Sequence, residues 1–258
     1  MRRELTIAIE AARAAGAAIR AIYDTPFEVR QKGHDNPVTE ADLQANERIQ
    51  SLIQREFPRD GWLSEETHDN RERLTQSRVW IVDPLDGTKE FVQHLPEFCV
   101  CIALVERGEP IVAVSYNPVV DEMFAAERGR GLTLNGVRAH VSATSALADA
   151  RVLASRSEDK RGEWDVFKPH CTVELTGSVA FKLALIAAGR ADATFSLTPK
   201  NEWDICAGTL LITEGGGRVT DLAGQLLRFN QPDTRRSGLI ASNGRLHQPL
   251  TDLIARFS

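Results

Sequence analysis

One short segment constrains this chain more than any other, residues 80–91, which read WIVDPLDGTKEF. The apolar run over residues 79–82 has the length and β-branching of a buried strand, and Pro84 is expected to end that strand because proline lacks a ladder N–H. Gly87 allows the backbone to approach a ligand closely. If a helix begins near Asp86, the N–H groups of Gly87 and Thr88 face outward at the positive end of the helix dipole, which favours phosphate. The segment therefore predicts a sharp turn with carboxylates beside a phosphate-binding helix start.

A simpler interpretation of the same residues is a strand, a proline turn and an aspartate, Asp83, that only caps backbone amides. Two other acidic segments favour a functional site. Glu65 and Glu66 follow a short apolar run, and Asp204 falls in the first turn of a helix expected over residues 203–214. Four carboxylates in one cleft would repel by about 4 kcal/mol per close pair at an effective dielectric of about 20. Oxygen ligands without histidine or cysteine favour Mg²⁺ as the neutralising cation.

Hydrophobic periodicity predicts two N-terminal helices, over residues 4–23 and 39–57. Thr39 and Asp42 have the spacing of a capping box, so a capping role for Asp42 stays open beside a functional one. The polar residues 31–37 between the helices are expected to form a mobile loop next to the metal site.

The rest of the chain divides into an antiparallel meander and a second α/β half. Strands are expected over residues 99–105, 111–116, 123–126 and 152–154, and helices over 178–188, 203–214 and 245–257, with Gly189 closing the first of these helices. Residues 215–217, three glycines, predict the turn out of a helix. We expect a layered α+β sandwich in one compact unit: residues 1–145 carry most metal ligands, and residues 146–258 carry Asp204 and substrate contacts.

Composition excludes several classes of protein. A net charge of -5 argues against binding a nucleic-acid polymer, for which a basic stripe is expected. No run approaches ~18 apolar residues, so no transmembrane segment is expected. The N-terminus lacks the uninterrupted apolar core of a signal peptide, and the four cysteines form no C-x-x-C pair, which predicts a reduced, cytoplasmic protein. The sequence leaves a homodimer open.

Four motifs, taken together and in order, resemble the inositol monophosphatase superfamily of magnesium-dependent, lithium-sensitive phosphatases. They are PVTEAD at residues 37–42, SEE at 64–66, DPLDGTKEF at 83–91 and WD at 203–204, and they extend over most of the chain. Within this superfamily, DGTKEF is most similar to the 3'(2'),5'-bisphosphate nucleotidases of the CysQ type. The resemblance implies the five-layer αβαβα fold shared with fructose-1,6-bisphosphatase, and an active site where the two halves meet.

The resemblance also implies roles for individual residues. One Mg²⁺ is expected at Glu65, Asp83 and the carbonyl of Leu85, and a second at Asp83, Asp86 and Asp204, with room for a weaker third near Glu65. Together with Glu65, Thr88 and Asp42 are expected to orient and deprotonate the water that attacks phosphorus in line. For Thr88 the alternative is an ordinary threonine in a first helical turn. Glu66 is expected either to contact a metal ligand without touching the ion or to contact the metal ion that carries the attacking water.

The expected substrate is a small phosphate ester. Gly87, Thr88 and Lys89 would bind its reacting phosphate, whereas a second phosphate would meet Gly177, Ser178, Lys182 and Lys200; for each lysine a solvated surface charge is the alternative. The leading hypothesis is hydrolysis of adenosine 3',5'-bisphosphate, a by-product of sulfate assimilation, to AMP and phosphate.

Two alternatives stay open: an inositol or histidinol phosphatase, and a non-catalytic relative that binds metal or nucleotide. The inositol enzymes have an acidic residue seven positions before the aspartate of the WD motif, and this residue binds the hydroxyl groups of the substrate. This chain has Leu197 there, although Glu202 would partly substitute for that acid.

Overall fold

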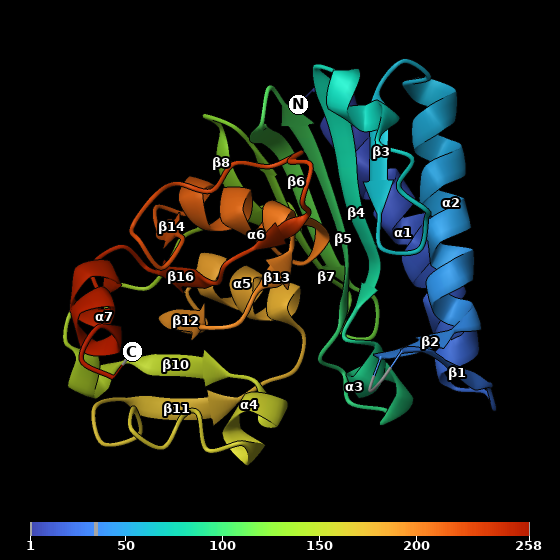
Figure 1. The fold of residues 1–258 in the computed structure, drawn as a ribbon. Coiled ribbons are helices and arrows are strands. Elements are labelled where there is room, and N and C mark those ends of the chain that lie inside the picture. Colours follow the sequence, from blue (N-terminus) through green and yellow to red (C-terminus); the bar gives the residue numbers. More distant parts are fainter. Residues whose placement is uncertain (1, 34–35, 258) are drawn as a thin grey trace.

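The computed structural model describes residues 2–33 and 36–257. Two long helices, α1 (Arg3–Tyr23) and α2 (Glu40–Glu56), cover one face of a seven-stranded sheet (Figure 1). The strands follow each other across this sheet in chain order, as β3 (Gly61–Ser64), β4 (Arg78–Asp86), β5 (Cys99–Glu106), β6 (Glu109–Asn117), β7 (Glu122–Glu127), β8 (Gly131–Leu134) and β9 (Val137–Ala139).

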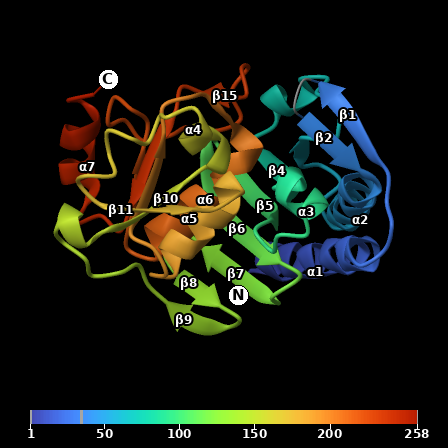
Figure 2. The same cartoon turned by 90° about the horizontal axis from the view of Figure 1, so that it is seen from below.

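A second pair of helices, α5 (Val179–Ala187) and α6 (Glu202–Glu214), lies between this sheet and a five-stranded one. The second sheet has the order β11-β10-β12-β16-β14, with β10 (Arg151–Ala154), β11 (Thr172–Leu175), β12 (Ala193–Ser196), β14 (Arg218–Thr220) and β16 (Leu239–Ser242). Helix α7 (His247–Ile254) packs outside it, whereas the short α4 (Arg156–Lys160) follows β10 (Figure 2). This arrangement confirms the predicted layered αβαβα fold.

Smaller elements complete the chain. They are the hairpin β1 (Val29–Gly33) and β2 (Asn36–Thr39), helix α3 (Thr88–Val92), the paired strands β13 (Lys200–Asn201) and β15 (Arg235–Arg236), and the 3₁₀ turns η1 (Glu72–Thr75) and η2 (Leu147–Asp149).

Strand β4 is buried on both faces, which fixes the large sheet between two helical layers. Trp80 and Val82 pack against the α1–α2 side, whereas Val79 and Ile81 join the core that contains residues of α5 and α6, such as Ile205. Side chains alternate between the faces of a strand, so one strand serves both cores. The start of α6 is therefore packed directly against the sheet that carries the N-terminal acidic residues.

Proline does not end β4, contrary to the expectation from the sequence. The strand continues to Asp86, and its pairing with β5 shifts register between Asp83, opposite Cys101, and Asp86, opposite Cys99. Pro84 lies within this irregularity, where no ladder N–H is required of it. The expected turn is thus a bulged strand end.

Two other predictions also differ from the structure. Residues 31–33 and 36–37 belong to the β1–β2 hairpin instead of a loop, because β1 finds an antiparallel partner in β2; residues 34–35 of the predicted loop lie outside the described residues. The last helix ends at Ile254, earlier than expected. Over residues 2–33 and 36–257, no helix has the length and apolar character needed to cross a membrane.

Candidate active site

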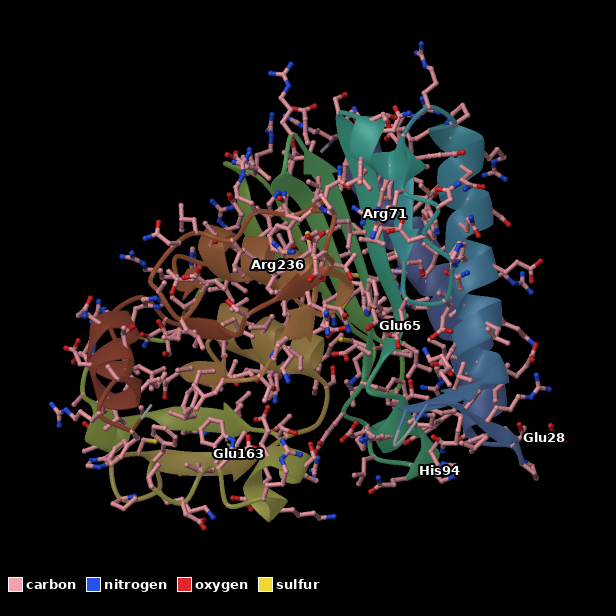
Figure 3. All side chains as sticks on the ribbon, viewed as in Figure 1. Glu28, Glu65, Arg71, His94, Glu163 and Arg236 are labelled. Atoms are coloured by element: carbon pink, nitrogen blue, oxygen red, sulfur yellow. The ribbon has the colours of Figure 1, made fainter. Side chains whose placement is uncertain are left out.

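Three carboxylates from distant parts of the chain converge at the junction of the two halves. Strands β3 and β4 are parallel, with Ser64 opposite Val82, so Glu65 and Asp83 emerge at the same edge of the sheet. Asp204 reaches them from the first turn of α6. Each of these three residues offers a carboxylate oxygen within 4.8 Å of the others. Glu65 lies near the end of β4 in Figure 3.

Asp86 belongs to the same region but is held by the C-terminal half. Its Oδ2 accepts hydrogen bonds from the backbone N–H of Ala180, at 2.6 Å, and from the hydroxyl of Ser178. These contacts attach the end of β4 to the start of α5. Asp86, itself a predicted metal ligand, therefore lies close to Asp83 and Asp204, and one of its oxygens already accepts these two hydrogen bonds.

Burial and mutual repulsion change the acidity of these groups. Burial is the main cause that raises the pKa of Asp83 well above its usual range, and the neighbouring carboxylates of Glu65, Asp86 and Asp204 raise it further. Burial, with the carboxylates of Asp86 and Glu65, does the same to the pKa of Asp204. The Oδ2 atom of Asp83 is buried and has no hydrogen-bond partner among the described residues.

This donor set fits a divalent cation. A hard cation would neutralise the repulsion between the carboxylates, and the unpartnered oxygen of Asp83 would coordinate that cation. The structure thus brings together Glu65, Asp83 and Asp204, as the sequence predicted, and each of them could contribute an oxygen ligand.

Thr88 and Asp42 form the hydrogen bond that the family resemblance implies. The hydroxyl of Thr88 lies 2.8 Å from Asp42 Oδ1 and 3.2 Å from the carbonyl oxygen of Leu85. Asp42 is 1% exposed, and its other oxygen accepts from the backbone N–H and the hydroxyl of Thr39, each at 2.7 Å. The capping role of Asp42 and its contact with Thr88 therefore coexist. The carbonyl of Leu85, predicted as a metal ligand, here faces the threonine hydroxyl.

A lysine that the sequence did not single out reaches the acidic cluster from the β1–β2 hairpin. Lys32 Nζ donates to Glu65 at 2.7 Å and to Glu66 at 2.5 Å. Burial alone would lower the pKa of Lys32, but these two carboxylates raise it overall. Glu66 is thus next to the cluster and contacts Lys32. The only sequence signal for this contact was the position of Lys32 in a polar segment expected beside the site.

A cavity of about 310 Å³ opens beside the acidic cluster. The N-terminal half contributes Glu65, Leu85, Asp86, Gly87, Thr88, Lys89 and Glu90 to its lining; the C-terminal half contributes Ser155, Ser157, Gly177, Ser178, Lys182, Lys200 and Asp204. Every predicted phosphate and substrate contact therefore borders one cavity. Ser155, Ser157 and Glu90 were not predicted as site residues, although Glu90 lies within the DPLDGTKEF motif.

The lysines of this cavity differ in their surroundings. Lys182 is 4% exposed, and burial lowers its pKa to about 8; no ion pair involves it among the described residues. Lys200 Nζ lies 3.4 Å from Glu158 and 3.2 Å from the hydroxyl of Thr198. Neither lysine is the solvated surface charge that was the alternative.

Gly177 does not offer its N–H to the cavity, which corrects the role expected for it. That N–H donates to Glu97 at 2.6 Å, and Glu97 also pairs with Arg156. A Cβ on Gly177 would lie 2.2 Å from the side chain of Glu90, so any other residue here would displace that side chain. The hydroxyl of Ser178 is likewise directed at Asp86.

Glu202 does not replace the missing acidic residue of the inositol enzymes. It is fully buried and accepts from the backbone N–H groups of Asn230, at 2.6 Å, and Gln231, at 3.0 Å. Leu197 is 39% exposed and does not border the cavity. A hydroxyl-binding carboxylate at either position is therefore missing from this cavity.

Comparisons with known proteins find similar sequences and structures over nearly the whole chain. The family model described as "Inositol monophosphatase family" matches residues 1–257. The Nus factor SuhB of Escherichia coli K12 is 38% identical over 231 residues, which cover 85% of each chain. A Thermotoga maritima IMPase structure has a TM-score of 0.88 and 30% identity, covering 99% of this chain and 98% of that one. The structure of CysQ from Bacteroides thetaiotaomicron has a TM-score of 0.78 and 33% identity, covering 93% and 97%.

Proposed function

Because the chain belongs to the inositol monophosphatase family, we propose that it is a magnesium-dependent phosphomonoesterase whose substrates carry a second anionic group. Adenosine 3',5'-bisphosphate, hydrolysed to AMP and phosphate, is the substrate that we infer. The proposal rests mainly on Lys182, which lies on the wall of the cavity that Asp86, Thr88 and Asp204 also line. Its side chain is buried and forms no ion pair with the described residues. The carboxylates of Glu158, Asp86 and Glu90 act on this buried charge without forming a direct ion pair, so an anionic ligand in the cavity would supply the direct partner that Lys182 lacks.

The electrostatics of the inner cavity support the same class of substrate. Glu158 is 5% exposed; burial raises its pKa, but the nearby Lys182 and Lys200 lower it overall, so it is charged between them. Glu158 is thus paired with Lys200 and lies close enough to Lys182 to act on its pKa, so two cations are gathered on this wall of the cavity. A second phosphate bound there would be held apart from the phosphate that reacts.

The reacting phosphate would lie at the start of α3, where the free N–H groups of the first turn favour an anion. Held by Glu65, Asp83 and Asp204, with Asp86 beside them, Mg²⁺ would polarise the phosphoryl group and neutralise its charge. Thr88 donates its own proton toward Asp42, which leaves its oxygen free to accept a proton from an attacking water. Burial raises the pKa of Asp42, so this carboxylate is a better proton acceptor than an exposed aspartate.

Lys182→Ala tests the second-anion contact, with 3'-AMP as the matched substrate because it lacks the 5'-phosphate. A lost charge-assisted hydrogen bond of ~1.5–3 kcal/mol predicts a fall in kcat/KM of roughly 10- to 150-fold for the bisphosphate, mainly through KM. The rate with 3'-AMP should stay nearly unchanged. Lys160→Ala, on the exposed end of α4, is the control. Equal losses on both substrates would remove the support for a second-anion site.

The pH dependence gives a second readout of the same lysine. With a pKa of about 8, Lys182 is charged at pH 7 and loses its proton as the pH rises through 8. The preference for the bisphosphate over 3'-AMP should therefore decline above pH 8. Lys182→Arg keeps its charge there, so the decline should be smaller in that variant.

An inositol monophosphatase is the second candidate, favoured by the similarity to the Thermotoga maritima IMPase. The absence of the hydroxyl-binding acidic residue, whose position is occupied by Leu197, argues against this second candidate. Inhibition by lithium, tested by titrating LiCl against KCl at equal ionic strength, would follow from either candidate. Identical curves for the two salts would speak against a family-like metal site.

A further inference from the structure

Arg73 is a buried arginine that joins the two halves of the molecule. It lies in η1, between β3, which ends just before Glu65, and β4, which carries Asp83, and is 2% exposed. Its guanidinium binds Asp69 through two hydrogen bonds, of 3.1 and 2.8 Å. It also donates to the side-chain oxygen of Asn230, at 2.7 Å, and to the carbonyl oxygen of Gln231, at 3.1 Å, 157 and 158 positions later in the chain.

The loop that Arg73 holds is also bound to the start of α6. Asn230 and Gln231 donate their backbone N–H groups to the two oxygens of Glu202, the first residue of α6. The N–H of Glu202 in turn donates to the carbonyl oxygen of Thr234, at 2.8 Å. Asp204 follows in the same helical turn. Arg71 and Arg236 mark the two sides of this region in Figure 3.

We propose that Arg73, Asn230, Gln231 and Glu202 form a brace that positions Asp204 against Glu65 and Asp83 and thereby sets the affinity for the second metal ion. This inference rests on the proposed metal-dependent function. Without cations the three carboxylates repel each other, and the repulsion acts between the halves. A connection from η1 to the first residue of α6 opposes that separation directly. Arg73 and Glu202 are therefore positioning residues.

The test is a titration of Mn²⁺ into metal-free protein without substrate, followed by calorimetry and by electron paramagnetic resonance of free Mn²⁺. Groups behind metal ligands typically change metal affinity by roughly 10- to 100-fold when they are removed. Arg73→Met should weaken the site that needs Asp204 by that factor. Asn230→Gly, which suits the backbone φ of 59° and keeps the N–H to Glu202, should weaken it in the same direction.

Arg190→Met is the matched control, because Arg190 also forms an ion pair between the halves, with Glu122, but away from the start of α6. It should bind Mn²⁺ as the wild type does. A purely structural role of the brace would lower the unfolding temperature in EDTA and leave the dissociation constants unchanged; that result, with folded variants, would overturn the proposal. Wild-type protein that binds no Mn²⁺ would instead overturn the metal site on which the proposal rests.

Discussion

At the scale of single residues, the site consists mainly of carboxylates whose burial and mutual repulsion destabilise the metal-free fold. Asp83 is almost completely buried, one of its oxygens has no partner among the described residues, and its pKa is raised by burial and by three neighbouring acids. A group whose pKa is higher in the folded than in the unfolded state favours folding less as it ionises. The stability of metal-free protein should therefore fall as the pH rises from the usual aspartate pKa through the raised one.

Asp83→Asn tests this cost. The variant should unfold in EDTA at pH 8 at a temperature equal to or above that of the wild type, because it removes a buried negative charge. It should lose nearly all phosphatase activity and most of the stabilisation that Mg²⁺ gives the wild type. Thermal unfolding at pH 5 and pH 8, with and without Mg²⁺, measures the change in unfolding temperature and the stabilisation by Mg²⁺. Phosphate release measures the activity. Wild-type turnover by the variant at saturating Mg²⁺ would refute the ligand role of Asp83.

Thr88→Ala should lower kcat by roughly 100- to 10,000-fold, since a positioned proton acceptor contributes on that order. The affinity for Mn²⁺ should change little, because the side chain of Thr88 contacts Asp42 and the Leu85 carbonyl instead of the acidic cluster. Thr88→Ser keeps the hydroxyl and should retain much of the rate. A Thr88→Ala enzyme with normal kcat would return this residue to the role of an ordinary first-turn threonine.

At the scale of elements, the sequence predicted what local patterns encode. Helices α1, α2, α5 and α6 and strands β5, β6 and β7 were predicted nearly in place, because periodicity and glycine stops are local signals. The continuation of β4 through Pro84 was not, since the register shift depends on pairing with β5. The contacts of Lys32, Glu90 and Arg73 were also missed, because their partners are distant in sequence.

The start of α5 shows how such a distant contact constrains one element. Gly177→Ala would place a Cβ 2.2 Å from the Cγ and Cδ atoms of Glu90. We expect a loss of about 1–3 kcal/mol in the free energy of unfolding, typical of overpacking. Urea unfolding measures it, with Gly33→Ala as the control because no atom of the described residues beyond its chain neighbours lies within 4 Å of the added Cβ there. Adding Glu90→Ala to the variant should recover part of the loss; an unchanged loss would show that Glu90 is not the obstacle.

At the scale of the whole molecule, the candidate site exists only where the halves meet. Glu65, Asp83 and Thr88 come from the N-terminal half, and Asp204 and Lys182 from the C-terminal half. The motif order allowed this convergence to be predicted, but which side chains face the cavity depends on packing between α5, α6 and the large sheet. Oligomeric state and the predicted absence of nucleic-acid polymers among its partners stay predictions.

Steady-state kinetics of the Mg²⁺-loaded wild type on adenosine 3',5'-bisphosphate and inositol 1-phosphate test the proposed substrate class most directly. A second-phosphate contact of ~1.5–3 kcal/mol predicts a kcat/KM at least roughly tenfold higher for the bisphosphate, with no phosphate release from either substrate in excess EDTA. A higher kcat/KM for inositol 1-phosphate would contradict this account and give the function to an inositol monophosphatase.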